Sequence, residues 1–315
     1  MTNFVERRPF NLMGMFDGLE EYLNTGDPVV REWFMVKSNF WPIFLCSSYL
    51  LIIKVIGPAM MRDRKPFELR KTMMLYNIFL VASYAACVSV VGYGIAMTGP
   101  TALCKNTLVT RKDYTYVMAA SGWVIYLLKY AEFLDTIFFV LRKKDKLITN
   151  LHVIHHASLP ICGWIFFRTE RSGFQAYPIL INSVIHIVMY SYYALAAMGP
   201  QVRKYLWWKR YLTIAQMIQF ILIISFVTVI MPLTGCTAAK SSIYINVIAA
   251  GLFFALFYNF YQTSFKPTKP KSSRTNGKSV EETNGNGETN GYGKGQNGCK
   301  NGEDIANGQS KVKCN

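Results

Sequence analysis

Charged side chains are scarce in this chain of 315 residues. Asp, Glu, Lys and Arg make up 17% of it, whereas an average soluble domain has about 25%. Hydrophobic residues reach 51% and aromatic residues 15%, more apolar side chains than a soluble surface can bury. The sequence also lacks a Gly-rich phosphate loop, a repeat of fixed period and an apolar signal-peptide core in residues 1–38. These absences argue against a soluble protein and favour an integral membrane protein.

Acidic residues are also few, 18 against 34 Lys and Arg, which gives a net charge of +16. A soluble nucleic-acid binder of this charge would carry its basic residues across folded faces. Here they form short clusters between long apolar stretches. We therefore expect a lipid bilayer as the surroundings and no nucleic-acid partner.

Seven apolar stretches predict seven membrane-spanning helices. Most reach the ~20 residues that cross the hydrocarbon core as a helix, and the first and fourth are close to the ~17-residue minimum. Helices are the expected form because backbone polar groups cannot stay unpaired in lipid. The expected fold is an all-α integral membrane protein with spans at residues 40–56, 73–97, 116–141, 151–167, 175–198, 212–231 and 243–262.

The loops between these stretches differ in charge. Loops one, three and five carry thirteen Lys and Arg, and loops two, four and six carry six. Because cytosolic loops are enriched in basic residues, the odd loops and the carboxyl terminus are predicted to be cytosolic. Residues 1–265 are predicted to form one membrane domain with seven helices. Residues 266–315 contain seven Asn-Gly dipeptides and almost no apolar side chains, which predicts a disordered cytosolic tail.

The four histidines all lie in predicted spans: His152, His155 and His156 in the fourth, and His186 in the fifth. Positions i, i+3 and i+4 share one helix face, so the first three should converge on one volume. Four histidines are too few for a di-iron site of the desaturase type, but a zinc ion with three histidine ligands stays possible. The metal-free alternative is imidazole as nucleophile or as acid and base.

Other polar residues also occur within the spans, where ionisable groups are costly and face a bundle interior or a cavity. Packing through hydrogen bonds is the plain alternative for the uncharged ones. Since spans two to seven all contribute polar groups, we expect a lined interior. The supporting residues are Lys129, Glu132, Asp135, Tyr190, Tyr193, Gln216, Gln219 and Asn77.

Four motifs together resemble the signature set of the very-long-chain fatty acid elongases, the membrane 3-oxoacyl-CoA synthases of the endoplasmic reticulum. They are K-x-x-E-x-x-D-T at 129–136, H-x-x-H-H at 152–156, H-x-x-M-Y-x-Y-Y at 186–193 and T-x-x-Q-x-x-Q at 213–219. The resemblance covers roughly residues 25–265. The run 204–213 and the polar tail are similar to the branch that acts on very long, often polyunsaturated chains.

The resemblance implies a reaction in which a long acyl-CoA condenses with malonyl-CoA, giving a 3-oxoacyl-CoA two carbons longer, CO2 and CoA, without a cofactor. It implies seven helices, the last six enclosing an acyl-chain tunnel. His155 would take the acyl group as an acyl-imidazole, His186 would assist the condensation, and His152 and His156 would orient the site. A metal-dependent membrane lipid oxidase or hydrolase that uses the histidines remains the alternative. A seven-span receptor would share the orientation but rarely combines such motifs.

Several further expectations concern the loops and the tail. Basic residues near the tunnel mouth are expected to bind the CoA phosphates: Lys204, Lys209, Arg210 and Arg142. Cys104 and Cys236 fall in non-cytosolic loops, where an oxidising lumen permits a disulfide, and elongases are similar in tying these loops together.

The terminal pattern K-x-K-x-x at Lys311 and Lys313 resembles a retrieval signal read by coat proteins, which predicts the endoplasmic reticulum membrane. Other enzymes of the elongation cycle and a second copy of the chain are further expected partners.

Overall fold

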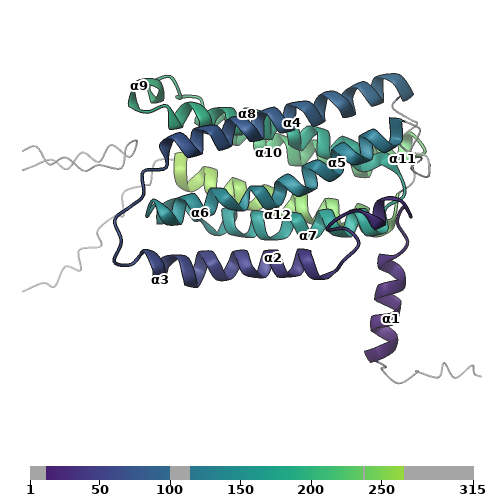
Figure 1. Ribbon diagram of the computed structural model, residues 1–315. Coiled ribbons are helices and arrows are strands. Elements are labelled where there is room, and N and C mark those ends of the chain that lie inside the picture. Colours follow the sequence, from purple (N-terminus) through teal and green to yellow (C-terminus); the bar gives the residue numbers. More distant parts are fainter. Residues whose placement is uncertain (1–11, 100–113, 237, 266–315) are drawn as a thin grey trace, which may run out of the picture. The chain divides into compact units, whose positions relative to one another are not determined.

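The computed structural model describes residues 12–99, 114–236 and 238–265 (Figure 1). The chain divides into two units, Met1–Thr268 and Lys269–Asn315, and all described residues belong to the first. The predicted disordered tail at 266–315 lies outside the described residues, and so do Lys311 and Lys313 of the predicted retrieval signal. The described residues form helices and no strand, so the all-helical prediction is confirmed for this part of the chain.

The first unit begins with α1 (Leu12–Leu23), the short helix η1 (Val30–Glu32) and a long helix made of α2 (Phe40–Leu51), η2 (Ile52–Ile56) and α3 (Gly57–Met61). Then come α4 (Arg70–Thr98), α5 (Tyr114–Ala131), α6 (Phe133–Leu141), η4 (Asp145–Leu147) and α7 (Asn150–Thr169). The remaining elements are η5 (Gly173–Gln175), α8 (Ala176–Ala197), α9 (Pro200–Arg203), α10 (Lys209–Ser225), η6 (Phe226–Ile230), α11 (Met231–Leu233) and α12 (Lys240–Phe265).

Five helices in the described part of the chain are long and apolar enough to cross a membrane: Phe40–Met61, Arg70–Thr98, Gly173–Ala197, Lys209–Leu233 and Lys240–Phe265. The other two predicted spans are also helical. The stretch 116–141 is interrupted at Glu132, between α5 and α6, and α7 carries three histidines. A multi-pass membrane protein is thus supported, while the count of seven spans stays a prediction.

Two of the long helices contain one wide turn each. In both cases the π-type turn, η2 or η6, ends just before a short helix with a proline at its start, Pro58 in α3 and Pro232 in α11. A proline ring has no amide hydrogen and collides with the preceding turn, so the helix widens there instead of breaking. Each chain segment therefore continues in one direction as a single long helix.

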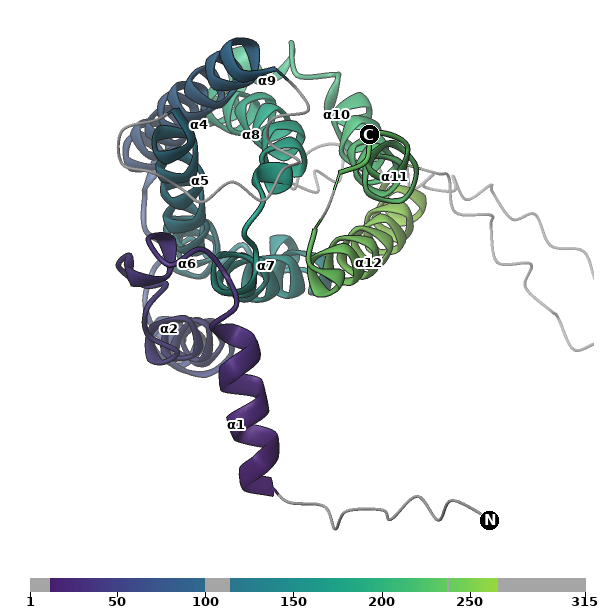
Figure 2. The same cartoon turned by 90° about the vertical axis from the view of Figure 1, so that its right-hand side faces the viewer.

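Six of the helices form a closed ring, which Figure 2 shows almost end-on. Around this ring, α4 contacts α8, α8 contacts α10, α10 contacts α12, α12 contacts α7, α7 contacts α5, and α5 returns to α4. The helix α2 packs outside the ring against α7. The ring consists of the last six predicted spans, and its interior is where the polar residues of the motifs meet.

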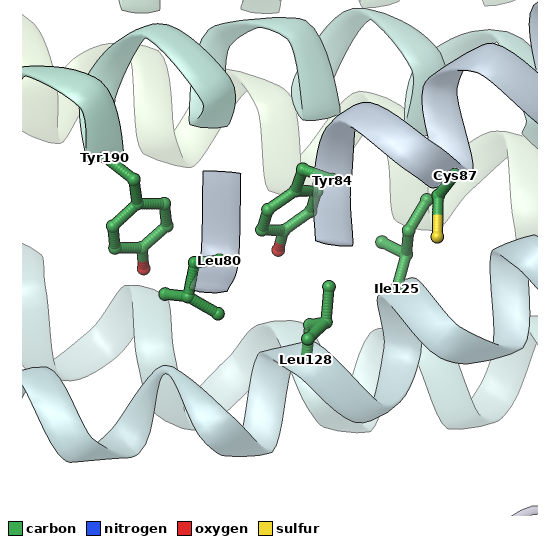
Figure 3. Packing of buried hydrophobic residues seen from close by; sticks show 6 residues of the cluster. All are labelled: Leu80, Tyr84, Cys87, Ile125, Leu128 and Tyr190. Carbon is green, nitrogen blue, oxygen red and sulfur yellow. The ribbon is translucent and has the colours of Figure 1, made fainter. Parts of the chain in front are cut away.

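A buried cluster joins α4, α5 and α8 beside the polar residues (Figure 3). Its residues on α4 are Leu80, Tyr84 and Cys87, and Ile125, Leu128 and Tyr190 complete it. Tyr84 and Tyr190 are fully buried, and their hydroxyl groups point toward the helix that carries Ile125 and Leu128. The apolar contacts of these two rings therefore place two phenol groups against the K-x-x-E-x-x-D-T motif.

The basic loops one, three and five come together at one end of the ring. Arg70 Nε donates to the carbonyl of Ala197 at 2.6 Å, and Lys143 Nζ donates to the carbonyl of Arg62 at 3.1 Å. The loops that precede α4, follow α6 and follow α8 thus share one side, as an orientation with one basic end requires. Which compartment faces that end is not set by these contacts and stays a prediction.

Candidate active site

The ring encloses a cavity of about 560 Å³. Its wall is mostly apolar and includes Ile125 of α5, Leu159 and Phe166 of α7, Ile179 of α8 and Ile223 of α10. Such a wall suits a hydrocarbon chain, because a ligand of this kind gains free energy from the apolar area it loses to water.

The cavity extends from the histidines in one direction only. On α7 its lining residues begin at His155 and continue to Phe167, with Glu170 beyond the helix end; on α5 they begin at Thr115 and stop at Lys129. On α8 the last lining residue is Asn182, four residues before His186. Fifteen residues of helix separate position 155 from 170, which corresponds to roughly 22 Å. The cavity is therefore a slot whose histidine end is the one nearer the basic loops, and whose far end is lined by Asp27, Glu170, Arg171, Ser172 and Gln175.

Among the described residues that line this cavity, His155 is the only histidine. It is half-buried, its ring lies edge-on against Phe253 at a centroid distance of 4.9 Å, and its centroid is 6.4 Å from that of His186. Its Nδ1 has no hydrogen-bond partner within the described residues. His155 is thus an imidazole with a buried, unpartnered ring nitrogen at the end of the slot nearer the basic loops.

Behind the cavity wall, Glu132 is the centre of a buried polar cluster and is only 1% exposed. Its Oε1 accepts a hydrogen bond from Tyr84 at 2.5 Å and lies 3.0 Å from His186 Nδ1. Its Oε2 lies 3.9 Å from His156 Nδ1. A carboxylate with this many partners serves to hold the surrounding groups rather than to react itself.

Lys129 links this cluster to the cavity. Its Nζ forms an ion pair with Glu132 Oε1 at 3.2 Å, lies 3.4 Å from His186 Nε2 and donates to Asn182 Oδ1 at 3.4 Å. Lys129 and Asn182 both line the cavity. A cation and an amide therefore lie on the wall, where they can stabilise negative charge on a ligand oxygen.

His152 and His156 lie one turn apart on α7 and do not line the cavity. His152 Nε2 is hydrogen-bonded to Thr136 Oγ1 at 2.8 Å, and that hydroxyl also bonds to the Tyr49 hydroxyl at 2.9 Å. The His152 and His156 rings have a centroid distance of 4.3 Å, and His156 is buried. The H-x-x-H-H pattern thus gives one ring in the cavity and two behind it.

Asp135 occupies the face of α6 next to the buried tyrosines. It accepts a hydrogen bond from the Tyr190 hydroxyl at 2.9 Å, and the Tyr76 ring packs edge-on against Tyr190 at 6.4 Å. Tyr193 packs edge-on against Tyr190 at 5.9 Å but is 38% exposed. Of the supporting tyrosines, Tyr190 belongs to the buried cluster and Tyr193 lies at its margin.

The amides that the sequence marks as supporting do not contact the histidines. Gln216 Nε2 donates to Met189 Sδ at 3.5 Å. Gln219 and Asn77 are buried, and the side-chain oxygen of each has no hydrogen-bond partner in the described ranges. Within the described residues, no hydrogen bond connects these three side chains to the cluster around Glu132.

The basic residues expected to bind CoA phosphates lie at the end of the ring opposite the cavity. Arg210 Nε donates to the Tyr261 hydroxyl at 2.8 Å, Arg142 Nη1 donates to Met73 Sδ at 3.0 Å, and Lys204 Nζ lies 4.9 Å from the Tyr205 ring centroid. Lys209, at the start of α10, is exposed. Their role toward CoA stays a prediction.

Two site residues were not singled out from the sequence. Asn182 lies four residues before His186 and so shares its helix face, and extending the pattern 186, 190 and 193 by one turn would have found it. Tyr84 has no comparable signal, because a tyrosine in an apolar helix is ordinary. It follows Asn77 by seven residues on the buried face of α4, but its bond to Glu132 depends on how α4 and α5 pack.

The metal-site alternative is not favoured by this arrangement. In residues 12–99, 114–236 and 238–265, no group of three or more His, Cys, Asp or Glu side chains could hold a metal ion. Where Glu132 and His186 come together, the Lys129 ammonium is already close to both side chains. It lies 3.2 Å from Glu132 Oε1 and 3.4 Å from His186 Nε2. A cation bound there would be repelled by that charge.

Of the described cysteines, three have free thiols and one is in a disulfide bond. Cys46, Cys87 and Cys162 are free, and Cys162 lines the cavity two turns along α7 from His155. Cys236 is in a disulfide bond. Its predicted partner, Cys104, lies outside the described residues, so this pairing stays a prediction.

Comparison with known proteins agrees with the motifs. Residues 34–273 match the family described as ELO, GNS1/SUR4. A very long chain fatty acid elongase of Aedes aegypti is 37% identical over 260 residues, covering 82% of this chain and 72% of the relative. Very long chain fatty acid elongase 7 of Drosophila melanogaster is 35% identical (88% and 82% covered), and elongase 4 of Homo sapiens is 36% identical (79% of each covered). With a family match over most of its length and relatives of this similarity, the chain belongs to the ELO (GNS1/SUR4) family, that of the very long chain fatty acid elongases.

Proposed function

We propose that this protein is a very-long-chain 3-oxoacyl-CoA synthase that condenses a long acyl-CoA with malonyl-CoA. The products are a 3-oxoacyl-CoA two carbons longer, CO2 and free CoA. The observation that carries the proposal is the one-sided cavity, which begins at His155 and continues between mostly apolar walls away from the basic loops. In this proposal the reacting carbon lies at the imidazole, the hydrocarbon chain in the slot and the CoA group toward the basic end.

In the first step, a ring nitrogen of His155 attacks the thioester carbonyl and forms a C–N bond. The C–S bond breaks, the imidazole loses its proton, and the CoA thiolate takes up a proton as it leaves. The negative charge that develops on the carbonyl oxygen is stabilised by the Lys129 ammonium and by the NH2 group of Asn182, both on the cavity wall. The acyl group is then held on the histidine as an acyl-imidazole.

In the second step, malonyl-CoA loses CO2 and the remaining carbanion attacks the acyl carbonyl. A new C–C bond forms, the C–N bond to His155 breaks, and the imidazole regains a proton. His186 faces His155 at a centroid distance of 6.4 Å and assists this step, while Glu132 holds Lys129 and His186 in place. His152 and His156 pack behind His155 and fix its ring.

The six-helix ring around the cavity corresponds in this proposal to an acyl tunnel within a seven-span protein. The basic end, with Lys204, Lys209, Arg210 and Arg142, faces the cytosol and receives the CoA phosphates. The protein resides in the endoplasmic reticulum membrane, with its carboxyl terminus in the cytosol, and needs no cofactor. Coat proteins that read the terminal lysines, other elongation enzymes and a second copy of the chain are its proposed partners.

The acyl-imidazole is tested by trapping it. Purified protein is incubated with a long acyl-CoA in the absence of malonyl-CoA, and peptides are analysed by mass spectrometry. We expect one acyl group on His155, release of one CoA, and discharge of the acyl group when malonyl-CoA is added.

Cys162 provides the matched control, since it is the free thiol on the same face of α7 and also lines the cavity. We expect His155→Ala to abolish both the adduct and the condensation, and Cys162→Ala to retain both. An acyl group on Cys162, or near-normal turnover by His155→Ala, would refute the imidazole as nucleophile.

A further inference from the structure

The connection between α1 and α2 is tied to the ring at the far end of the cavity. We call residues 24–38 the strap. Three aromatic side chains of α5 and α7 donate to consecutive strap carbonyls: Trp123 to Phe34 (2.9 Å), Tyr126 to Met35 (3.1 Å) and Trp164 to Val36 (3.1 Å). Met35 has a φ of 63°, in the left-handed region that is unfavourable for a non-glycine residue. These hydrogen bonds hold the strap in a conformation it would not adopt alone.

Arg168, near the end of α7, joins the two ends of the strap. It is 7% exposed. Its Nε donates to the carbonyl of Leu23 at 3.0 Å and its Nη2 to Asn24 Oδ1 at 2.7 Å, at one end. Its Nη1 donates to the carbonyl of Lys37 at 2.9 Å, at the other end. A buried guanidinium must have its donors satisfied, so the strap and Arg168 stabilise each other.

The strap also forms part of the cavity wall. Asp27 and Val30 line the cavity, and the Asp27 carboxylate accepts from the amides of Val29 (2.8 Å) and Val30 (3.2 Å). Gly26 donates its amide to the carbonyl of Arg168 at 2.8 Å. A Cβ at Gly26 would lie 2.6 Å from that carbonyl oxygen, so only glycine allows the strap to lie this close to α7.

We propose that the strap, anchored by Arg168, is the end wall that limits the length of the acyl chain. This inference rests on the proposed function, in which the chain extends from His155 toward the strap. The distance along α7 from position 155 to 170 is roughly 22 Å, and a chain that fills it meets Asp27 and Val30. A longer chain would have to displace the strap, which its hydrogen bonds to α5 and α7 oppose.

The test compares Arg168→Met with Lys240→Met, a matched control at the exposed start of α12. Each variant is incubated with malonyl-CoA and a series of acyl-CoAs of increasing length, and the longest product is measured. We expect Arg168→Met to extend the longest product by at least one two-carbon round, while its condensation rate with a short acyl-CoA, whose chain ends before the strap, stays unchanged. Lys240→Met should match the wild type in both measurements.

Two more variants keep the test decisive if Arg168→Met does not accumulate. Gly26→Ala pushes the strap away from α7 and should also lengthen the longest product. Val30→Phe adds volume at the end wall while the Arg168 contacts remain, and it should shorten the longest product. An unchanged longest product in Gly26→Ala and Val30→Phe, with normal short-chain turnover, would refute the strap as end wall. No condensation by the wild type would instead refute the proposed function.

Discussion

The hydrogen bond between Tyr84 and Glu132 gives the sharpest test of the buried cluster. Tyr84→Phe removes the hydroxyl that donates to Glu132 Oε1 at 2.5 Å and keeps the ring, which is fully buried and lies 5.2 Å from the Lys129 ammonium. The apolar contacts and the cation–π contact therefore remain, and the change isolates one hydrogen bond.

The magnitude depends on whether Glu132 is ionised. Hydrogen bonds to charged groups contribute ~1.5–3 kcal/mol, whereas interhelical hydrogen bonds in membrane proteins average about 0.6 kcal/mol. Because Lys129 Nζ is 3.2 Å from the carboxylate, we take Glu132 as ionised. We therefore expect Tyr84→Phe to lower the free energy of unfolding by ~1.5–3 kcal/mol and to reduce condensation, since Glu132 positions Lys129 and His186.

The assay is reversible unfolding in mixed micelles, followed by tryptophan fluorescence, on a double-mutant cycle with Glu132→Gln. In the Glu132→Gln background, the cost of Tyr84→Phe should fall to about 0.6 kcal/mol. Tyr49→Phe is the matched control, because its buried hydroxyl bonds to the neutral hydroxyl of Thr136 at 2.9 Å. The same cost of Tyr84→Phe in both backgrounds, or a cost below that of Tyr49→Phe, would refute a charge-assisted bond.

Two further predictions concern the ion pair and the tail. Lys129→Met leaves the Glu132 carboxylate buried without its ammonium and should destabilise the protein by ~3–5 kcal/mol in the same unfolding assay; adding Glu132→Gln should recover part of this loss, and no recovery would count against the ion pair. Changing Lys311 and Lys313, which lie outside the described residues, to Ser should let the protein reach the Golgi, as seen by fluorescence microscopy, with its condensation rate intact. An unchanged reticular distribution would mean that the membrane helices hold the protein there.

The helices and the convergence of the three histidines of α7 could be predicted from the sequence, because both follow from helix periodicity. The spacing of His152, His155 and His156 placed their rings together, with centroid distances of 4.3 Å and 5.5 Å between neighbours. The helical repeat of 3.6 residues does not determine which of the three rings faces a cavity. His155 lines the cavity because of the way α7 packs against α5 and α12.

The interruption of the third stretch at Glu132 was not predicted. Lys129, Glu132 and Thr136 share a face in an uninterrupted helix, but the chain makes a tighter turn at Glu132, where the Asp135 amide bonds to the Glu132 carbonyl at 3.1 Å. The prediction for Gln216 differs from the structure in another way. Its position suggested a polar wall, yet its amide contacts Met189, because side-chain direction across a helix interface depends on tertiary packing.

The buried cluster also has a consequence for how the chain enters the membrane during synthesis. Lys and Asp at the centre of a helix oppose insertion by about 2.5–3.5 kcal/mol each, and α5 and α6 together carry Lys129, Glu132 and Asp135. Tyr84 is made 48 residues before its partner Glu132, whereas His186 follows Lys129 by 57 residues and Tyr190 follows Asp135 by 55. A nascent chain that has produced α7 but not α8 therefore has only part of this cluster satisfied. Synthesis of α8 is the event that completes it, so a chain truncated before α8 should be recognised and degraded more readily than one truncated after it.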